Sequence, residues 1–451
     1  MTTVMERILK AHATKTLSEP LLELTLSKGG KAVATGEGKL SVKADGCLQI
    51  DVNAASIPFN FDPLVRGAMI PADQFYEINA RTSDNLIFTA SKVYTKSISA
   101  DIEAGSRAIF EPWQVKLLAP IDQLNNSSFE VLMTPFEWDF VNCKCKVGEV
   151  NPVFGDRVDG FWLSEETEDA AIGLRKIESW VHLKINSKVA DQDHAEKCAI
   201  AFVKALRFHA GKYLECFALI RTTNQTEEVT LFDLKLNNGP AFFKPLPPHE
   251  FHATEKLLMA GMRFFLQESS IPIYLAISHC WESRKLTFQP GCLLTCSVVE
   301  GMADYIVKDA SEQFGRFRDL ALGLLRKEPR ATNTPYLDEF EKILGEMKFL
   351  KGKESIKESG KILKISITVE ELKAWGQLRN RLAHGNFSLD VTSPSTLQAE
   401  FDAAASVANI VNKFILGLIQ YEGVYCNYSS KGFPSCEFPS GTIVPKPPHF
   451  F

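Results

Sequence analysis

The first half of the chain alternates apolar and polar residues over short runs. Five such runs have a period at or near two, at residues 21–26, 39–43, 48–52, 86–90 and 129–133. A period of two places successive side chains on opposite faces of a strand, so each run predicts a strand with one buried face. Gly, Asn, Asp and Pro separate the runs, as they do in the turns of a sheet.

One helix interrupts this strand pattern. Apolar residues recur there at helical spacing, at Ala195, Cys198, Ala199, Phe202 and Leu206. Asp193 and Glu196 stand three residues apart at its start and predict a capping box. Residues 213–221 and 229–236 then return to strand character. We therefore predict a β-rich α+β domain over residues 1–240.

A segment dense in proline and turn residues follows this predicted domain. Residues 237–248 read Asn-Asn-Gly-Pro-Ala-Phe-Phe-Lys-Pro-Leu-Pro-Pro, a composition that cannot continue a helix or a central strand. We place a linker at residues 241–252.

Beyond the linker the apolar residues recur every three or four positions. Two stripes of this kind cover residues 257–265 and 293–306. Further helices are predicted around residues 314–325, 336–349, 369–384 and 396–421. The pattern predicts an all-α bundle over residues 253–422. Residues 423–451 show no period and many Pro, Ser and aromatic residues, so we expect an extended C-terminal arm.

Composition and charge narrow the class of protein. The hydrophobic share of 45% and the charged share of 23% are those of ordinary folded domains and argue against disorder. A net charge of -5 gives no global attraction to nucleic acid. The most apolar helical stretch, residues 403–421, is interrupted by Asn409, Asn412 and Lys413, so we expect no membrane span and a cytoplasmic protein.

The ten cysteines suggest buried thiols rather than disulfides, because they are scattered with few close pairs. Cys143 and Cys145 form the closest pair. A zinc site would need a second pair or nearby histidines, and neither follows at usable spacing. A Gly-rich phosphate loop of the GxxxxGK[ST] type is also missing from the sequence. We therefore expect no metal and no cofactor.

The chemistry-bearing motif lies late in the helical region, in the run Arg379-Asn-Arg-Leu-Ala-His384 followed by Gly385. Asn380 and His384 are four residues apart and share a helix face, so the amide could orient the imidazole. The long side chain of Arg379 could reach a phosphate held beside His384. His384 ends the helix, where the negative helix end favours a charged imidazolium.

These residues resemble the HEPN superfamily, whose ribonuclease members carry Arg-x4-6-His, often as Arg-Asn-x-x-x-His, late in a bundle helix. The order of helices before and after the motif is similar as well. The resemblance implies cleavage of RNA without a metal, with Arg379 and His384 as catalytic residues. It also implies a homodimer through the bundle, in which two copies of the motif meet at one scissile phosphate.

The longer architecture, a β-rich half followed by such a bundle, looks like the ApeA group of bacterial anti-phage proteins. That resemblance implies an abortive-infection effector acting on tRNA or another single-stranded RNA, with a phage-derived trigger at the N-terminal domain. The alternative is a catalytically inactive HEPN module that binds a nucleotide or a partner protein.

Four other residues are candidates for the same site. By the resemblance, Glu300 occupies the place of an acidic residue that faces the motif and could hold Arg379, although it could equally be a solvated glutamate. Arg381 is either a second phosphate contact or an exposed helix arginine. Lys361 and Lys364 belong to a lysine-rich segment that could follow an RNA backbone; glutamates interrupt it, which favours a solvated loop instead.

Overall fold

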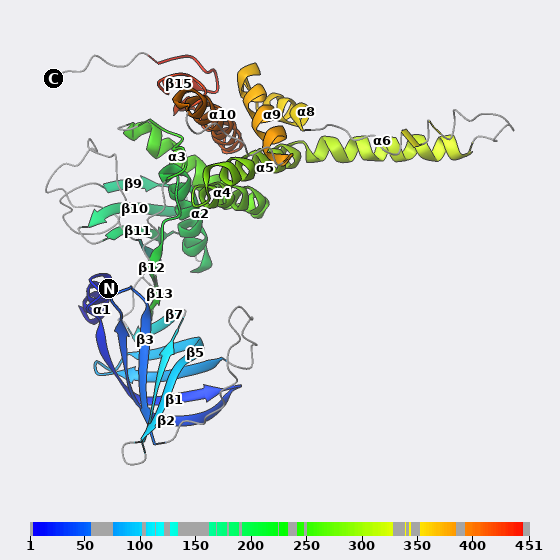
Figure 1. Ribbon diagram of the computed structural model, residues 1–451. Helices are drawn as coiled ribbons and strands as arrows, with labels where there is room; N and C mark the ends of the chain where they lie inside the picture. Colours follow the sequence, from blue (N-terminus) through cyan, green and yellow to red (C-terminus); the bar gives the residue numbers. More distant parts are fainter. Residues whose placement is uncertain are drawn as a thin grey trace, which may run out of the picture. The chain divides into compact units, whose positions relative to one another are not determined.

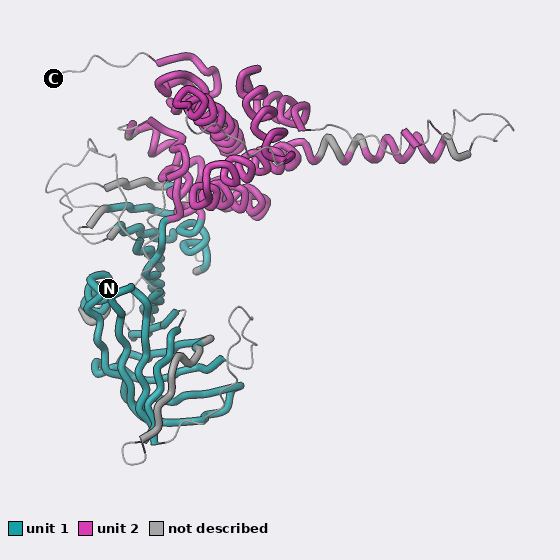
Figure 2. The backbone as a smooth tube through the Cα atoms, viewed as in Figure 1, with its two compact units in different colours: residues 1–200, 214–238 teal, residues 201–213, 239–451 magenta. Residues whose placement is uncertain are grey.

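The computed structural model divides the chain into two compact units (Figure 2). Unit 1 holds residues 1–200 and 214–238, and unit 2 holds residues 201–213 and 239–451. The residues that the structure describes are 3–55, 75–101, 105–112, 114–120, 127–133, 162–167, 169–177, 180–188, 192–223, 225–232, 241–247, 250–327, 339, 342–343, 352–384 and 393–444. Unit 1 ends at residue 238, but unlike the predicted first domain of residues 1–240 it excludes residues 201–213.

Unit 1 is built on one antiparallel sheet (Figure 1). Its first seven strands are β1 (Ser18–Lys28), β2 (Lys31–Val42), β3 (Leu48–Ala54), β4 (Tyr76–Thr82), β5 (Ile87–Asp101), β6 (Gly105–Glu111) and β7 (Gln114–Pro120). The strand order β4-β1-β2-β3-β6-β5 is closed by a further pairing of β4 with β5. Six strands therefore form a closed ring, and the long β5 also pairs with β7.

The sheet continues beyond β7 with strands from later in the chain. They are β8 (Ser128–Met133), β9 (Trp162–Glu166), β10 (Ala170–Ile177), β11 (Trp180–Ser187), β12 (Cys216–Thr222) and β13 (Thr226–Phe232). The order β7-β13-β12-β8-β11-β10-β9 places β13 directly against β7, although more than a hundred residues separate Pro120 from Thr226.

The core of unit 1 follows from the alternation of the strands. In β4, Tyr76, Ile78, Ala80 and Thr82 are buried and the residues between them are exposed. Helix α1 (Thr3–Ala13) adds Ile8 and Leu9 to the same core. His12 on α1 is completely buried, and its Nε2 lies 2.8 Å from the carbonyl oxygen of Phe232. Burial lowers the pKa of His12 to about 4, so this histidine is neutral at pH 7.

Helix α2 (Gln192–Ala210) is the helix predicted inside the strand pattern. The predicted capping box is wrong, because Asp193 lies within the first turn and Glu196 pairs with Arg221 of β12. Residues 201–213, the second half of α2 and the turn after it, belong to unit 2.

Unit 2 is helical. Its helices are α3 (Phe251–Phe265), η2 (Glu268–Ser270), α4 (Ile271–Ser283), α5 (Phe288–Ile306), α6 (Lys308–Lys327), α8 (Lys353–Ile362), α9 (Val369–Ala383) and α10 (Pro394–Leu418). Helix α5 is central and packs against α4, α8, α9 and α10. The multidomain architecture of a β-rich part followed by a helical part is therefore confirmed; the predicted helix at 336–349 lies almost wholly outside the described residues.

Helix α10 is long and apolar enough to cross a membrane by length and composition alone. In the structure, 61% of its most apolar window is buried. Asn409, Asn412 and Lys413 are buried too, and each donates a hydrogen bond inside unit 2. Helix α10 is thus a core helix of the helical unit.

Several segments differ from the sequence prediction, among them helices α1 and α4, where no helix was predicted. Residues 353–362, expected in a solvated loop, form helix α8. The expected extended arm contains a hairpin of β14 (Gly423–Cys426) and β15 (Ser435–Phe438). The expected linker contributes Phe242, which is buried in unit 2.

Candidate functional site

The motif residues lie at the C-terminal end of α9, a helix with a well-defined start. Thr368 caps it: the Thr368 side chain accepts from the Glu371 N–H at 3.2 Å, and the Thr368 N–H donates to Glu371 Oε2 at 2.8 Å. This reciprocal pair is a capping box. Leu372, Trp375, Leu378 and Leu382 bury one face of the helix, which leaves the remaining positions free for polar contacts.

Glu371 also anchors the helix to the rest of unit 2. Its carboxylate is completely buried and accepts hydrogen bonds from Lys413 Nζ (2.8 and 3.0 Å), Asn409 Nδ2 (2.7 Å) and Ser429 Oγ (2.7 Å). The network joins α9, α10 and the residues after β14. The Thr-x-x-Glu spacing at 368–371 could have revealed the cap from the sequence, but its partners come from distant segments.

Arg379 points toward α5. Its Nε donates to Glu300 Oε1 at 2.8 Å, and the side chains are 42% and 30% exposed. The two terminal nitrogens of the guanidinium donate to no other residue in the described parts of the chain, so they remain available to an outside acceptor. A guanidinium held through Nε keeps a fixed direction for its outer fork, the geometry that binds a phosphate through two oxygens.

His384 ends α9. It is the C-cap, with φ -89° and ψ 11°, and its backbone N–H donates to the carbonyl oxygen of Asn380 at 3.2 Å. Both side chains are exposed. Within the described residues they share no hydrogen bond, so the amide does not orient the imidazole as expected. Among the described residues, no side-chain hydrogen bond or ion pair involves the His384 imidazole, and its exposure makes it accessible to a molecule from outside.

Arg381 points to a different neighbour. It forms a two-pronged ion pair with Glu400 of α10, and Arg381 Nε is buried. Positions 379 and 381 are about 200° apart around a helix, so the two arginines cannot address one phosphate without rearrangement. A phosphate contact of Arg381 would require breaking its pair with Glu400. The sequence offered no signal for this pair, since 19 residues separate the partners.

Lys361 and Lys364 lie beside the other end of α9. Lys361 is in the last turn of α8 and pairs with Glu358 at 2.7 Å, and Lys364 follows in a left-handed conformation with φ 56°. Both are exposed. His384 closes α9 fifteen residues after its first residue, about 22 Å along the axis. The structure therefore does not bring these lysines to the motif end.

Two thiols lie beneath the site on α5. Burial raises the pKa of Cys292 to about 11 and that of Cys296 to about 12. The Cys296 carbonyl oxygen accepts from Trp375 Nε1 at 3.3 Å. Both thiols are protonated at neutral pH and serve packing rather than nucleophilic chemistry. Cys143 and Cys145 lie outside the described residues.

Unit 1 holds a separate buried polar cluster on β8, β10 and β11. Arg175 Nε donates to His182 Nδ1 at 3.1 Å, and His182 Nε2 lies 2.6 Å from Glu130 Oε2. Because Nδ1 accepts, Nε2 carries the proton and the ring is neutral. Burial lowers the pKa of His182 in the same sense, although Glu130 opposes it. Burial alone would raise the pKa of Glu130, but His182 and Lys184 lower it to about 2.

The described residues contain no group of three or more His, Cys, Asp or Glu side chains placed to hold a metal ion. No protein-family model, no curated protein and no solved structure matches the chain.

Proposed function

We propose that the protein is a metal-independent endoribonuclease of the HEPN type, with Arg379 and His384 as its catalytic residues. The observation that carries the proposal is the arginine held at Nε by Glu300, with its outer nitrogens open, on the helix that ends in an exposed histidine. Exposed Arg-His pairs on surfaces are common; here a third residue orients the arginine, and that restraint is expected of a site that must bind one phosphate in one geometry.

The chemistry follows from what RNA cleavage requires. A base removes the proton of the ribose 2′-hydroxyl, the oxygen attacks the adjacent phosphorus, and an acid protonates the leaving 5′-oxygen. Arg379 would neutralise charge on the phosphorane. Attack and departure occur on opposite sides of phosphorus, so one histidine does not serve both. Two copies of His384, one from each chain of a homodimer, supply both roles.

The products expected are a 2′,3′-cyclic phosphate and a free 5′-hydroxyl. We assign the activity to anti-phage defence, with unit 1 as the part that receives the trigger and tRNA or another single-stranded RNA as the substrate. This assignment rests on the succession of a β-rich unit and a helical unit.

The proposal is tested with the full chain, total RNA and EDTA. We expect cleavage that the chelator does not reduce and that falls by at least about 10²-fold in His384→Ala, because a positioned acid or base contributes that much. His279→Ala is the matched control, as His279 is also an exposed histidine on a helix of unit 2. DNA of the same sequence should remain intact.

The opposite result identifies the alternative function. Absence of cleavage in the presence of phage lysate and of every RNA class, combined with unchanged binding of RNA by His384→Ala, would make the protein an inactive binding module.

A further inference from the structure

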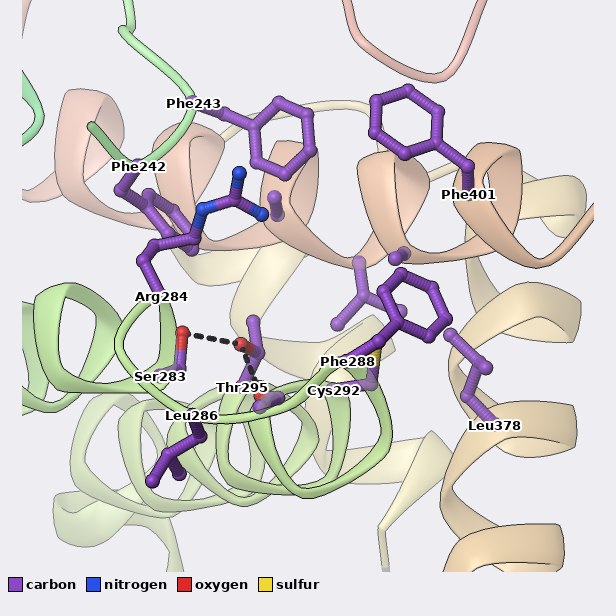
Figure 3. A pocket seen from close by; sticks show the side chains of 14 residues that line it. Phe242, Phe243, Ser283, Arg284, Leu286, Phe288, Cys292, Thr295, Leu378 and Phe401 are labelled. Atoms are coloured by element: carbon purple, nitrogen blue, oxygen red, sulfur yellow. Dashed lines mark hydrogen bonds between the residues drawn. The ribbon is translucent and has the colours of Figure 1, made fainter. Parts of the chain in front are cut away.

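A pocket of about 250 Å³ lies inside the helical unit (Figure 3). Its walls come from the end of α4, from α5, α9 and α10, and from the segment 241–247. Two of the lining residues, Phe288 and Phe401, are 41% and 38% exposed, so the end of the pocket that they form is open to solvent. A pocket of this size accommodates a small ligand, and the neighbouring helices give it fixed walls.

Most of the lining is aromatic or aliphatic. Phe242 and Phe243 lie at one end beside Arg284, while Phe288 and Phe401 lie at the other (Figure 3). The ring centres of Phe243 and Phe401 are 6.1 Å apart, and the rings are tilted by 51°. Rings in such arrangements provide faces and edges against which a flat molecule can pack.

Arg284 is the only charged residue in this lining. Its guanidinium carbon lies 5.5 Å from the centre of the Phe243 ring, and its Nε is buried without a hydrogen-bond partner. The described residues contain no carboxylate paired with it. A buried N–H that donates to nothing destabilises the fold, so an acceptor that arrives with a ligand would recover this loss.

The two hydroxyl groups of the lining already have partners. Thr295 Oγ1 lies 3.2 Å from Ser283 Oγ and 2.9 Å from the Gly291 carbonyl oxygen, and Ser283 Oγ donates to the Cys280 carbonyl oxygen at 2.7 Å. Arg284 is therefore the polar group left to select a ligand.

We propose that this pocket binds a small aromatic carboxylate, with its ring among the phenylalanines and its carboxylate on Arg284. A carboxylate matches the fork of a guanidinium with two parallel hydrogen bonds. A single positive charge among phenylalanine rings balances one negative charge; a group with two charges would leave one of them uncompensated in an apolar site. The site is independent of the proposed ribonuclease, since neither Arg379 nor His384 lines it.

Calorimetry on the full chain with 2-naphthoate tests whether the positive charge of Arg284 binds the carboxylate. We expect one site per chain and an affinity that falls by about 10- to 100-fold in Arg284→Gln, the usual loss when a charged hydrogen-bond pair is removed. Arg263→Gln on α3 is the matched control, because Arg263 is exposed and does not line the pocket. The uncharged naphthalen-2-ylmethanol should bind both Arg284 forms equally.

A second variant tests whether 2-naphthoate binds inside this pocket. Ala404 lines the pocket and is half-buried, so Ala404→Phe fills the space with little strain on the core and should abolish 2-naphthoate binding. Ala403→Phe is its control, since Ala403 is also half-buried but does not line the pocket.

Three results would overturn the proposal: no binding of 2-naphthoate up to its solubility limit, equal affinity in Ala404→Phe and Ala403→Phe, or a preference for AMP over 2-naphthoate. If Arg284→Gln does not fold, the comparison of 2-naphthoate binding between Ala404→Phe and Ala403→Phe tests the proposal by itself.

Discussion

At the scale of single residues, we expect the ion pair of Arg379 and Glu300 to matter little for stability and more for RNA cleavage. Both side chains are partly exposed, and exposed ion pairs stabilise a protein by about 0–1 kcal/mol. Glu300→Gln should therefore change the free energy of unfolding by less than about 1 kcal/mol. It should slow RNA cleavage by about tenfold, equivalent to about 1.4 kcal/mol, because the arginine loses its fixed direction.

The matched control is Glu282→Gln, which breaks the exposed pair of Glu282 with Lys285 at the end of α4 and should leave cleavage unchanged. Equal cleavage by both variants would show that Glu300 does not position Arg379. Urea denaturation and single-turnover cleavage measure the two quantities.

Arg379→Lys keeps the charge but removes the fork. We expect cleavage to fall by about 10²–10³-fold, the cost of losing a donor aimed at developing charge. The variant should fold normally, with an unchanged circular dichroism spectrum. Cleavage at the wild-type rate would mean that charge alone suffices, and the two-pronged contact with phosphate would be wrong.

His12 makes the stability of unit 1 depend on pH. Burial lowers its pKa from 6.5 to about 4. Between these two pH values His12 is protonated in the unfolded chain and neutral in the folded chain. Stability should therefore be complete above pH 6.5 and decline as the pH falls toward 4. Between pH 7 and pH 5 the loss should be about 2 kcal/mol.

His12→Gln retains an N–H for the Phe232 carbonyl oxygen and does not titrate. Urea denaturation of unit 1 at both pH values should show a smaller loss in this variant. The same loss in both proteins would assign the pH dependence to other groups, foremost His182, whose pKa is also lowered by burial.

At the scale of elements, the buried charge of Glu371 holds the motif helix in place. Glu371→Gln would leave Lys413 buried without its counter-charge, which typically costs about 3–5 kcal/mol. Glu370→Gln, one residue earlier and exposed, should change little. Thermal unfolding measures the difference, and comparable melting temperatures for the two variants would contradict the anchoring role.

Two helices that the sequence did not predict, α4 and α8, each lack the usual apolar stripe for a physical reason. Helix α8 buries Ser355, Ile356, Ser359 and Gly360. This face recurs at helical spacing but contains one large apolar residue, so a search for apolar stripes does not find it. Helix α4 is apolar on most sides and shows no polar face. Strand β3, by contrast, alternates buried and less buried residues along its length and matched its prediction.

In the candidate site too, some features could be predicted from the sequence and others could not. Local spacing placed Arg379 and His384 on one helix, and the resemblance pointed to Glu300. The pairs of Arg381 with Glu400 and of Glu371 with Lys413 join helices that meet only in the folded unit. Such contacts depend on helix packing, which the order of residues along one helix does not encode.

At the scale of the whole molecule, the proposed reaction needs two chains. If each site uses His384 from both copies, a dimer with one His384→Ala chain is inactive. In a random mixture of equal amounts of the two proteins, about one quarter of the dimers are fully wild type. Activity per total dimer should then fall to about one quarter rather than to one half.

Coexpression of differently tagged chains provides such a mixture, and cleavage of labelled RNA measures it. A mixture with His279→Ala in place of His384→Ala should keep full activity. Activity at one half would place a complete site in each chain.

The position of β13 also has a consequence for synthesis of the protein. Strand β7 pairs with β5 and with β13, and 105 residues lie between Pro120 of β7 and Thr226 of β13 in the chain. At about 5–20 residues per second, the ribosome needs roughly 5–20 s to deliver that strand, and an unpaired strand edge is prone to association during this time. The nascent chain can complete its sheet only at Phe232, before any helix that carries Glu300, Arg379 or His384 has been translated. A ribosome making this protein would thus complete the sheet before it translates the helices that carry the proposed site.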